Sequence, residues 1–124
     1  EGYPVDNCFV IGGIAQQGRV AGVDRSGLVE DWVARVRTDY VDEESGLLIQ
    51  AVDVRTGEAI DAPRGSGTTL GIFAVRYADE ALARDLYTAV KGRLDRSRSL
   101  MISPIISVPI ALAWASMRII RSGP

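Results

Sequence analysis

Two residues near the start of the chain, Asp6 and Cys8, are of types that can move protons. They follow Tyr3-Pro4 at the expected start of an apolar helix. There Asp6 could act as a general acid or base. Cys8 could act as an acid, or as a nucleophile whose pKa the helix N-terminus lowers. The alternative is that Asp6 or Asn7 caps the helix and that Cys8 is a small core residue.

A second set of such residues lies in the segment 62–69, which reads Ala-Pro-Arg-Gly-Ser-Gly-Thr-Thr. It precedes another apolar stretch, and amides at a helix N-terminus can bind anions. Arg64 could clamp an anion with two hydrogen bonds, and Ser66 could add its hydroxyl. The run lacks the Gly-Lys-Ser/Thr ending of a nucleotide-binding P-loop. Alternatively, Arg64 pairs with Asp53 or Asp61, and the glycines only form a tight turn.

Asp53 and Asp61 flank a predicted turn and offer a third option. Two carboxylates across a hairpin could form an acid/base pair for glycoside chemistry. The alternative is that both are ordinary loop carboxylates. Tyr3 completes the candidates, because its hydroxyl could donate a hydrogen bond to a substrate or its ring could form a pocket wall.

The elements that must position these residues are predicted to be helices of two alternating kinds. Helices that are apolar nearly all round are typically buried, whereas amphipathic helices show their charges to solvent. The apolar ones are 7–20, 68–77 and a last one from Val108 or Pro109 to Arg121; the amphipathic ones are 26–40 and 80–94. Residues 47–53 and 59–61 predict a small β-hairpin, and 95–99 a polar linker. Glycine is costly inside a helix, so Gly12-Gly13 predicts close packing against another backbone.

In an antiparallel series, the three apolar helices point the same way and begin at one rim. Their starts are Tyr3–Cys8, Ala62–Thr69 and Ile102–Pro104. We therefore predict that residues 1–124 form a single all-α domain with a small β-hairpin. Alternating inner and outer antiparallel helices would make it part of an (α/α)6-type toroid. Two and a half helical pairs cannot close a ring, so the toroid would be partial.

Composition excludes several classes of function. The chain has no histidine and one cysteine, which removes the common zinc-ligand sets and an intramolecular disulfide. We predict no metal and no cofactor. The formal net charge of −2, with both signs dispersed, argues against nucleic-acid binding. The segment from Leu100 to Met117 carries no charge, but its two prolines favour a buried helix over a membrane span.

The chain resembles the linalool dehydratase/isomerase-like domain family from Gly2 to about Ile120. The resembling stretches are Tyr3–Asp6, the turn Ser45–Leu48, the hairpin Val52–Asp61, the segment Ala62–Thr68 and the helix Asp79–Leu94. The resemblance implies an (α/α)-toroid fold. It also implies a Gly- and Asp-rich loop that ends in Asp-Ser-Gly-Pro before the last helix, of which only Ser103-Pro104 remains here. The enzyme that names the family dehydrates and isomerises a small terpene alcohol with acid/base residues, cysteines among them, and without a cofactor.

The sequence thus predicts a lyase- or isomerase-like domain for a small, largely apolar alcohol. Asp6 and Cys8 would handle protons, and Tyr3, Arg64 and Ser66 would orient the substrate. One alternative is a glycan-binding or glycoside-cleaving toroid that uses Asp53 and Asp61. Another is a non-catalytic scaffold in a larger membrane-associated protein. The sequence leaves three further partners open besides the substrate: the rest of a toroid, a membrane protein or a second copy of the chain. Membrane association and export from a bacterium stay open as locations.

Overall fold

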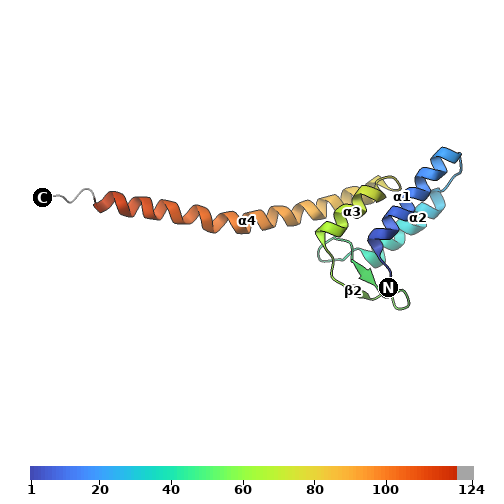
Figure 1. Cartoon of the computed structure of the whole chain (residues 1–124), viewed down its shortest axis with the longest axis horizontal. Helices are drawn as coiled ribbons and strands as arrows, with labels where there is room; N and C mark the ends of the chain where they lie inside the picture. Colours follow the sequence, from blue (N-terminus) through green and yellow to red (C-terminus); the bar gives the residue numbers. More distant parts are fainter. Residues whose placement is uncertain (120–124) are drawn as a thin grey trace. The chain divides into compact units, whose positions relative to one another are not determined.

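The computed structural model describes the backbone of residues 1–119 and the side chains of residues 1–100. Its elements are, in order, α1 (Pro4–Ala21), α2 (Ser26–Arg35), the π-helical turn η1 (Val36–Tyr40), β1 (Ala51–Val52), β2 (Ala59–Asp61), α3 (Gly65–Val75) and α4 (Glu80–Ile119) (Figure 1). The chain divides into two units, Glu1–Lys91 and Gly92–Pro124. The predicted mostly helical fold with one small antiparallel hairpin is confirmed.

Helix α1 begins at a proline. Pro4 occupies the first turn, where its fixed backbone angle suits a helix and its missing N–H costs nothing. Tyr3, with an extended backbone, is the N-cap, and its side chain makes no capping bond. The predicted capping role of Asp6 or Asn7 is therefore wrong, because Pro4 starts the helix before either residue. The helix ends at Gly22, whose left-handed backbone (φ 66°) glycine adopts readily.

Helices α1 and α3 pack directly on each other. A Cβ added at Gly12 would lie 2.5 Å from the carbonyl oxygen of Ala74, and one at Gly71 would lie 3.4 Å from the Cys8 sulfur. Contacts thus advance along both helices in the same direction, so the two helices are parallel (Figure 1). The predicted common direction of these helices and the close backbone contact at Gly12 are confirmed. Gly13 meets nothing within 4 Å.

The hairpin lies at the N-terminal end of α1. In its register, Ala51 opposes Asp61 and Val52 opposes Ala59. Gly2 exchanges two backbone hydrogen bonds with Val52, of 2.8 and 2.9 Å. Because β2 then leads directly into α3, the starts of α1 and α3 share one end of this unit. The predicted common rim is confirmed for these two helix starts.

The core of the first unit is formed by α1, α2, η1, α3 and the first part of α4. Its buried members come from all of these helices and from the loop before β1: Cys8, Ile11, Ala15, Val29, Val33, Val36, Leu48, Ala74, Val75, Leu82, Ala83 and Leu86. An ion pair of 2.7 Å between Arg37 and Asp85 joins η1 to α4. The amphipathic character predicted for the second and fourth helices is confirmed by the burial of Val33 and Leu82 on their inner faces.

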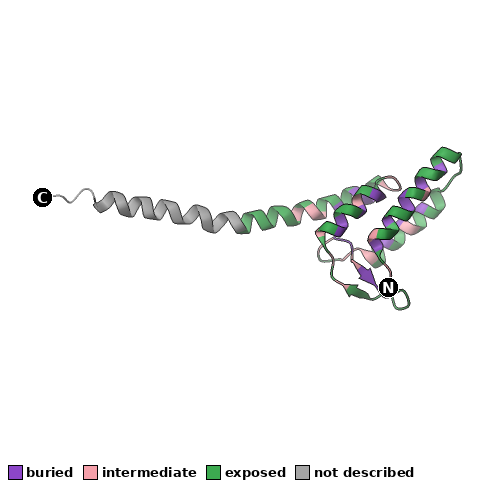
Figure 2. Cartoon of the chain, viewed as in Figure 1, coloured by how far each residue is buried: buried purple, intermediate pink, exposed green. Residues whose placement is uncertain are grey.

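The expectation that α1 and α3 are buried all round is wrong. Each helix has an exposed side, green in Figure 2. Phe9 is 46% exposed and Val10 is 59% exposed on α1, and Leu70 and Phe73 are each 57% exposed on α3. The described part of the chain supplies helices for only one side of the α1–α3 pair. Apolar composition shows that a helix favours burial, but it does not show which of its sides the chain buries.

The expected linker at Asp95–Ser99 is also wrong, because these residues are helical and belong to α4. The segment contains no glycine or proline, and arginine, which it contains twice, is a good helix former. Ile102–Pro104 consequently lies within α4 and starts no helix. The start of the last helix, predicted at Val108 or Pro109, also lies within α4. The expected end of that last helix, Arg121, lies outside the described residues.

Candidate functional site

Asp6 is an exposed carboxylate on the first turn of α1. Within the part of the chain that the structure describes, it makes no hydrogen bond and no salt bridge. Residues three and four positions apart share a helix face, so Phe9 and Val10 lie next to it on the surface. Both of these side chains are about half exposed. Asp6 is therefore an uncommitted proton-transfer group beside an apolar surface.

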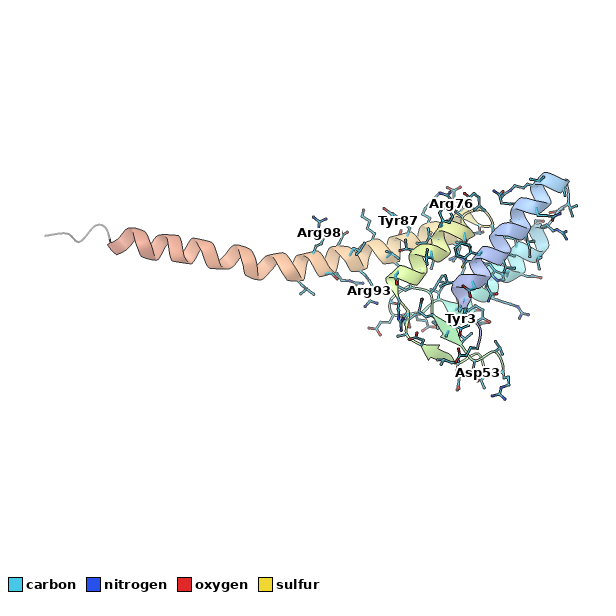
Figure 3. The ribbon with its side chains drawn as sticks, in the orientation of Figure 1. Tyr3, Asp53, Arg76, Tyr87, Arg93 and Arg98 are labelled. Carbon is cyan, nitrogen blue, oxygen red and sulfur yellow. The ribbon has the colours of Figure 1, made fainter. Side chains whose placement is uncertain are left out.

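Tyr3 lies just before α1 (Figure 3). Its hydroxyl donates a 2.5 Å hydrogen bond to Oε2 of Glu1. This bond, more than any other interaction, raises the pKa of Tyr3, and the charges of Glu1 and Asp6 act in the same direction. The Tyr3 hydroxyl is thus engaged by Glu1, while its half-exposed ring remains available as a wall.

Cys8 is fully buried and packs against Gly71 of α3. Burial raises the pKa of its thiol to about 12, because the thiolate would lose its hydration. The predicted role as a nucleophile with a lowered pKa is therefore wrong. Since α1 starts at Pro4, Cys8 lies in the second turn and points into the core. Its alternative role as a small core residue is confirmed.

Arg64 forms a salt bridge with Asp61, as one of the two sequence alternatives predicted. A single guanidinium nitrogen, Nη2, lies 2.9 Å from Oδ1 and 2.8 Å from Oδ2 of Asp61. Asp61 Oδ1 also accepts a 2.8 Å hydrogen bond from the amide of Ala62. Arg64 therefore stabilises the turn between β2 and α3, and it is not held as an anion clamp.

Asp53 serves the hairpin turn. It accepts a 2.8 Å hydrogen bond from the amide of Arg55, and its own amide donates to the carbonyl of Glu58 at 2.8 Å. Asp61 opposes Ala51 in the register, so Asp53 and Asp61 are not cross-strand neighbours. The two carboxylates are each used in a local turn, as the loop alternative predicted.

Thr68 is a structural residue whose role the sequence did not reveal. Its side chain is completely buried, and its hydroxyl accepts a 3.0 Å hydrogen bond from the amide of Leu48. The same hydroxyl donates a 2.8 Å hydrogen bond to the carbonyl of Arg64. Gly67, one residue earlier, leaves room for the side chain of Gln50, which a Cβ would strike. These contacts fasten the loop before β1 to the first turn of α3.

Ser66 lies on the first turn of α3, as Asp6 lies on the first turn of α1. It is exposed on the first turn and has no hydrogen-bond partner among the described residues. Leu70 and Phe73 follow it four and seven positions later, and both are exposed. The two parallel helices therefore each start with an uncommitted polar side chain and continue with an apolar surface.

A shallow apolar groove of about 180 Å³ runs between α1 and α3. Its lining carries no formal charge and consists of Phe9, Gly12, Gly13, Gln16, Phe73, Ala74 and Tyr77. Phe73 and Tyr77 meet edge to face, with centroids 6.4 Å apart. The Arg76 guanidinium lies over both rings, 5.0 and 4.7 Å from their centroids. Because its lining is uncharged and includes two glycines and an alanine, the groove can admit an apolar group.

A larger cavity of about 350 Å³ lies at the opposite end of α1, away from Asp6. Its lining mixes apolar side chains with charges of both signs: Ala15, Arg19, Val23, Asp24, Arg25, Ser26, Val29, Glu30, Ala78 and Asp79. Asp24 accepts a 2.9 Å hydrogen bond from the amide of Ser26, which lowers the pKa of Asp24. Arg19 donates to the carbonyl of Tyr77. The sequence indicated only turns here, because the cavity arises from tertiary packing.

Among the described residues, no group of three or more acidic, cysteine or histidine side chains could hold a metal ion. In the same part of the chain, no helix is long and apolar enough to cross a membrane. No protein-family model matches the sequence, and neither a curated protein nor a solved structure matches it significantly. The resemblance to the linalool dehydratase/isomerase-like family therefore remains a prediction from sequence motifs.

Proposed function

We propose that the chain is part of a lyase- or isomerase-like (α/α)-toroid domain that acts on a small, largely apolar alcohol. The observation that carries this proposal is the position of Asp6. A free carboxylate stands at the start of α1, and exposed apolar side chains follow it on the same helix face. An alcohol of this class needs both features, a group that handles the hydroxyl and a surface that holds the hydrocarbon.

The proposed chemistry requires one acid/base group. In a dehydration, the hydroxyl oxygen takes up a proton and the C–O bond breaks, so that water leaves. The neighbouring carbon then loses a proton as the C=C bond forms. A single carboxyl group that first donates a proton and then accepts one balances both steps. Asp6 fills this role in the proposal, with Ser66 as a hydrogen-bonding group at the start of α3. Cys8, buried with a raised pKa, has no part in it.

The groove, whose lining begins at Phe9 one turn beyond Asp6 and includes neither Asp6 nor Ser66, needs additional walls. Ligand pockets usually enclose ~300–1,000 Å³, whereas the groove between α1 and α3 measures about 180 Å³. In the proposed toroid, α1 and α3 are inner helices, and further inner helices would complete the pocket. The parallel course of α1 and α3 supports this arrangement.

The proposal is tested by incubating the protein with small tertiary and allylic alcohols and measuring alkenes and isomers by gas chromatography. General acid/base catalysis typically contributes ~10²–10⁴-fold, so Asp6→Asn should reduce turnover by about that factor. Asp31→Asn, which removes an exposed carboxylate from α2, should leave turnover unchanged. Equal turnover by Asp6→Asn and the unmodified protein would refute the role of Asp6.

The exposed apolar sides of α1 and α3 also favour the second candidate, a non-catalytic scaffold whose toroid holds a partner. In that case Asp6→Asn would alter no reaction, because no alcohol would be converted. Loss of partner binding in Phe73→Ser, with no turnover of any alcohol by the unmodified protein, would favour the scaffold. The glycoside alternative is disfavoured, because Asp53 and Asp61 are each committed to a separate turn.

A further inference from the structure

The two units of the chain differ strongly in charge. The first unit, residues 1–91, contains nine basic and fifteen acidic residues, which gives a formal charge of −6. The second unit, residues 92–124, contains five arginines and a single acidic residue, Asp95, which gives +4. Charge asymmetry of this size between parts of a chain is typical of proteins that contact nucleic acids or membranes. We therefore expect the basic surface that would bind such an anionic partner to lie on the second unit.

The structure describes the side chains of three of the five arginines of this unit. The side chains of Arg93, Arg96 and Arg98 are exposed and form no hydrogen bond or salt bridge with any described residue. Figure 3 shows Arg93 and Arg98 extending from different sides of α4. Of the eight arginines of the first unit, by contrast, only Arg35 is bonded to no described residue. Three donate hydrogen bonds (Arg19, Arg25 and Arg76) and four are paired with a carboxylate (Arg37, Arg55, Arg64 and Arg84). The second unit thus presents cations that the protein itself does not neutralise.

The sequence that follows these arginines is apolar. From Ser99 to Met117 there is no aspartate, glutamate, lysine or arginine, and Arg118 and Arg121 come directly after. Arginines on both sides of an uncharged apolar stretch suit an anionic lipid bilayer, in which hydrocarbon lies beneath a layer of phosphate groups. A nucleic acid would use the cations but would offer nothing to the apolar stretch.

We propose that the second unit docks the protein end-on on anionic lipid bilayers, so that Arg93 and Arg98, on different sides of α4, and Arg96 all reach the lipid phosphates. Each arginine near an anionic surface strengthens binding about fivefold, so the three together account for roughly 100-fold. The acidic first unit is repelled by the same surface, which restricts the contact to the second unit. The proposal is independent of the alcohol chemistry proposed above, because no residue of the groove takes part.

The test is sedimentation of the full chain with vesicles of phosphatidylcholine alone and of phosphatidylcholine mixed with phosphatidylserine. We expect much tighter binding to the mixed vesicles, and high salt should weaken it by screening. The variant with Arg93→Gln, Arg96→Gln and Arg98→Gln should lose roughly 100-fold in affinity for the mixed vesicles. Circular dichroism spectra of both proteins would verify that the variant is folded.

The matched control carries Arg35→Gln, Arg55→Gln and Arg84→Gln, which remove the same charge from exposed positions of the first unit. Because it makes the first unit more acidic, it should bind the mixed vesicles somewhat more weakly than the unmodified protein, but its loss should be far smaller than that of the first triple variant. Equal binding to both kinds of vesicle, or equal losses in the two triple variants, would overturn the proposal. Tighter binding to double-stranded DNA than to the mixed vesicles would also overturn it and would assign the arginines to nucleic acid.

Discussion

Gly12 of α1 lies directly against the main chain of Ala74 in α3, so closely that a Cβ at position 12 would be 2.5 Å from the Ala74 carbonyl oxygen. Such a distance is far below ordinary van der Waals contact. The absence of a side chain at this one position sets how closely the two helices approach. The groove beside Phe9 and Phe73 depends on that approach, because Gly12 and Ala74 form part of its lining.

Gly12→Ala should destabilise the protein, since the added methyl group must push α1 away from the α3 backbone. Overpacking of this kind typically costs about 1–3 kcal/mol. Gly13→Ala is the matched control, because Gly13 has open space around it and alanine is favoured over glycine inside a helix by about 1 kcal/mol. Urea unfolding of both variants measures the difference. A stabilised Gly12→Ala protein would contradict the described helix contact.

Thr68→Val should destabilise the first unit, because the valine methyl group cannot accept the hydrogen bond from the buried amide of Leu48. A buried donor left without a partner costs about 1–3 kcal/mol. Thr69→Val removes an exposed hydroxyl that bonds only the carbonyl of Gly65 in its own helix, so its effect should be much smaller. If the two valine variants unfold at the same urea concentration, Thr68 does not fasten the loop as described.

The burial of Cys8 predicts that stability falls at alkaline pH. The pKa of the thiol rises from its ordinary value of 9.0 to about 12 in the folded protein. Between these values only the unfolded chain loses the proton, so the native state binds more protons and its stability decreases as the pH rises. The full stability from this group is present below pH 9 and is lost progressively up to about pH 12, with a slope of about 1.4 kcal/mol per pH unit.

Cys8→Ala removes this pH dependence, although it also leaves a small cavity that lowers stability at every pH. The informative quantity is therefore the difference in unfolding free energy between the two proteins from pH 8 upwards. It should shrink as the pH rises, because only the unmodified protein loses the contribution of the thiol. A constant difference would show that Cys8 titrates normally and is accessible to solvent.

Much of the fold followed from local patterns in the sequence. Pro4 and the Gly-rich turn at 62–69 indicated where two helices begin, and Gly12 indicated a close backbone contact. The length of α4 did not follow, because the charged segment Asp95–Ser99 was interpreted as a linker although it contains no helix-breaking residue. Charge alone does not end a helix.

The candidate site was predicted less well than the fold, for a physical reason. The type of a residue shows which chemistry it can do, but not whether its side chain is already engaged. Cys8 proved to be buried, and Arg64 proved to be bonded to Asp61. The side chains of Asp6 and Ser66 form no hydrogen bond or salt bridge with any described residue. The groove between α1 and α3 could not be predicted, because it depends on which faces of two distant segments meet.

The measurement that tests the central claim most directly is a titration of the isotope-labelled protein with 1-hexanol, followed in backbone amide NMR spectra. Our account predicts saturable shifts at Phe9, Gly13 and Phe73, and at Asp6 on the preceding turn of α1. The Phe73→Ser variant should bind the alcohol more weakly. Saturable shifts confined to the cavity between Arg19 and Asp79, or no saturable shifts at all, would contradict the claim that the α1–α3 groove holds a small apolar alcohol.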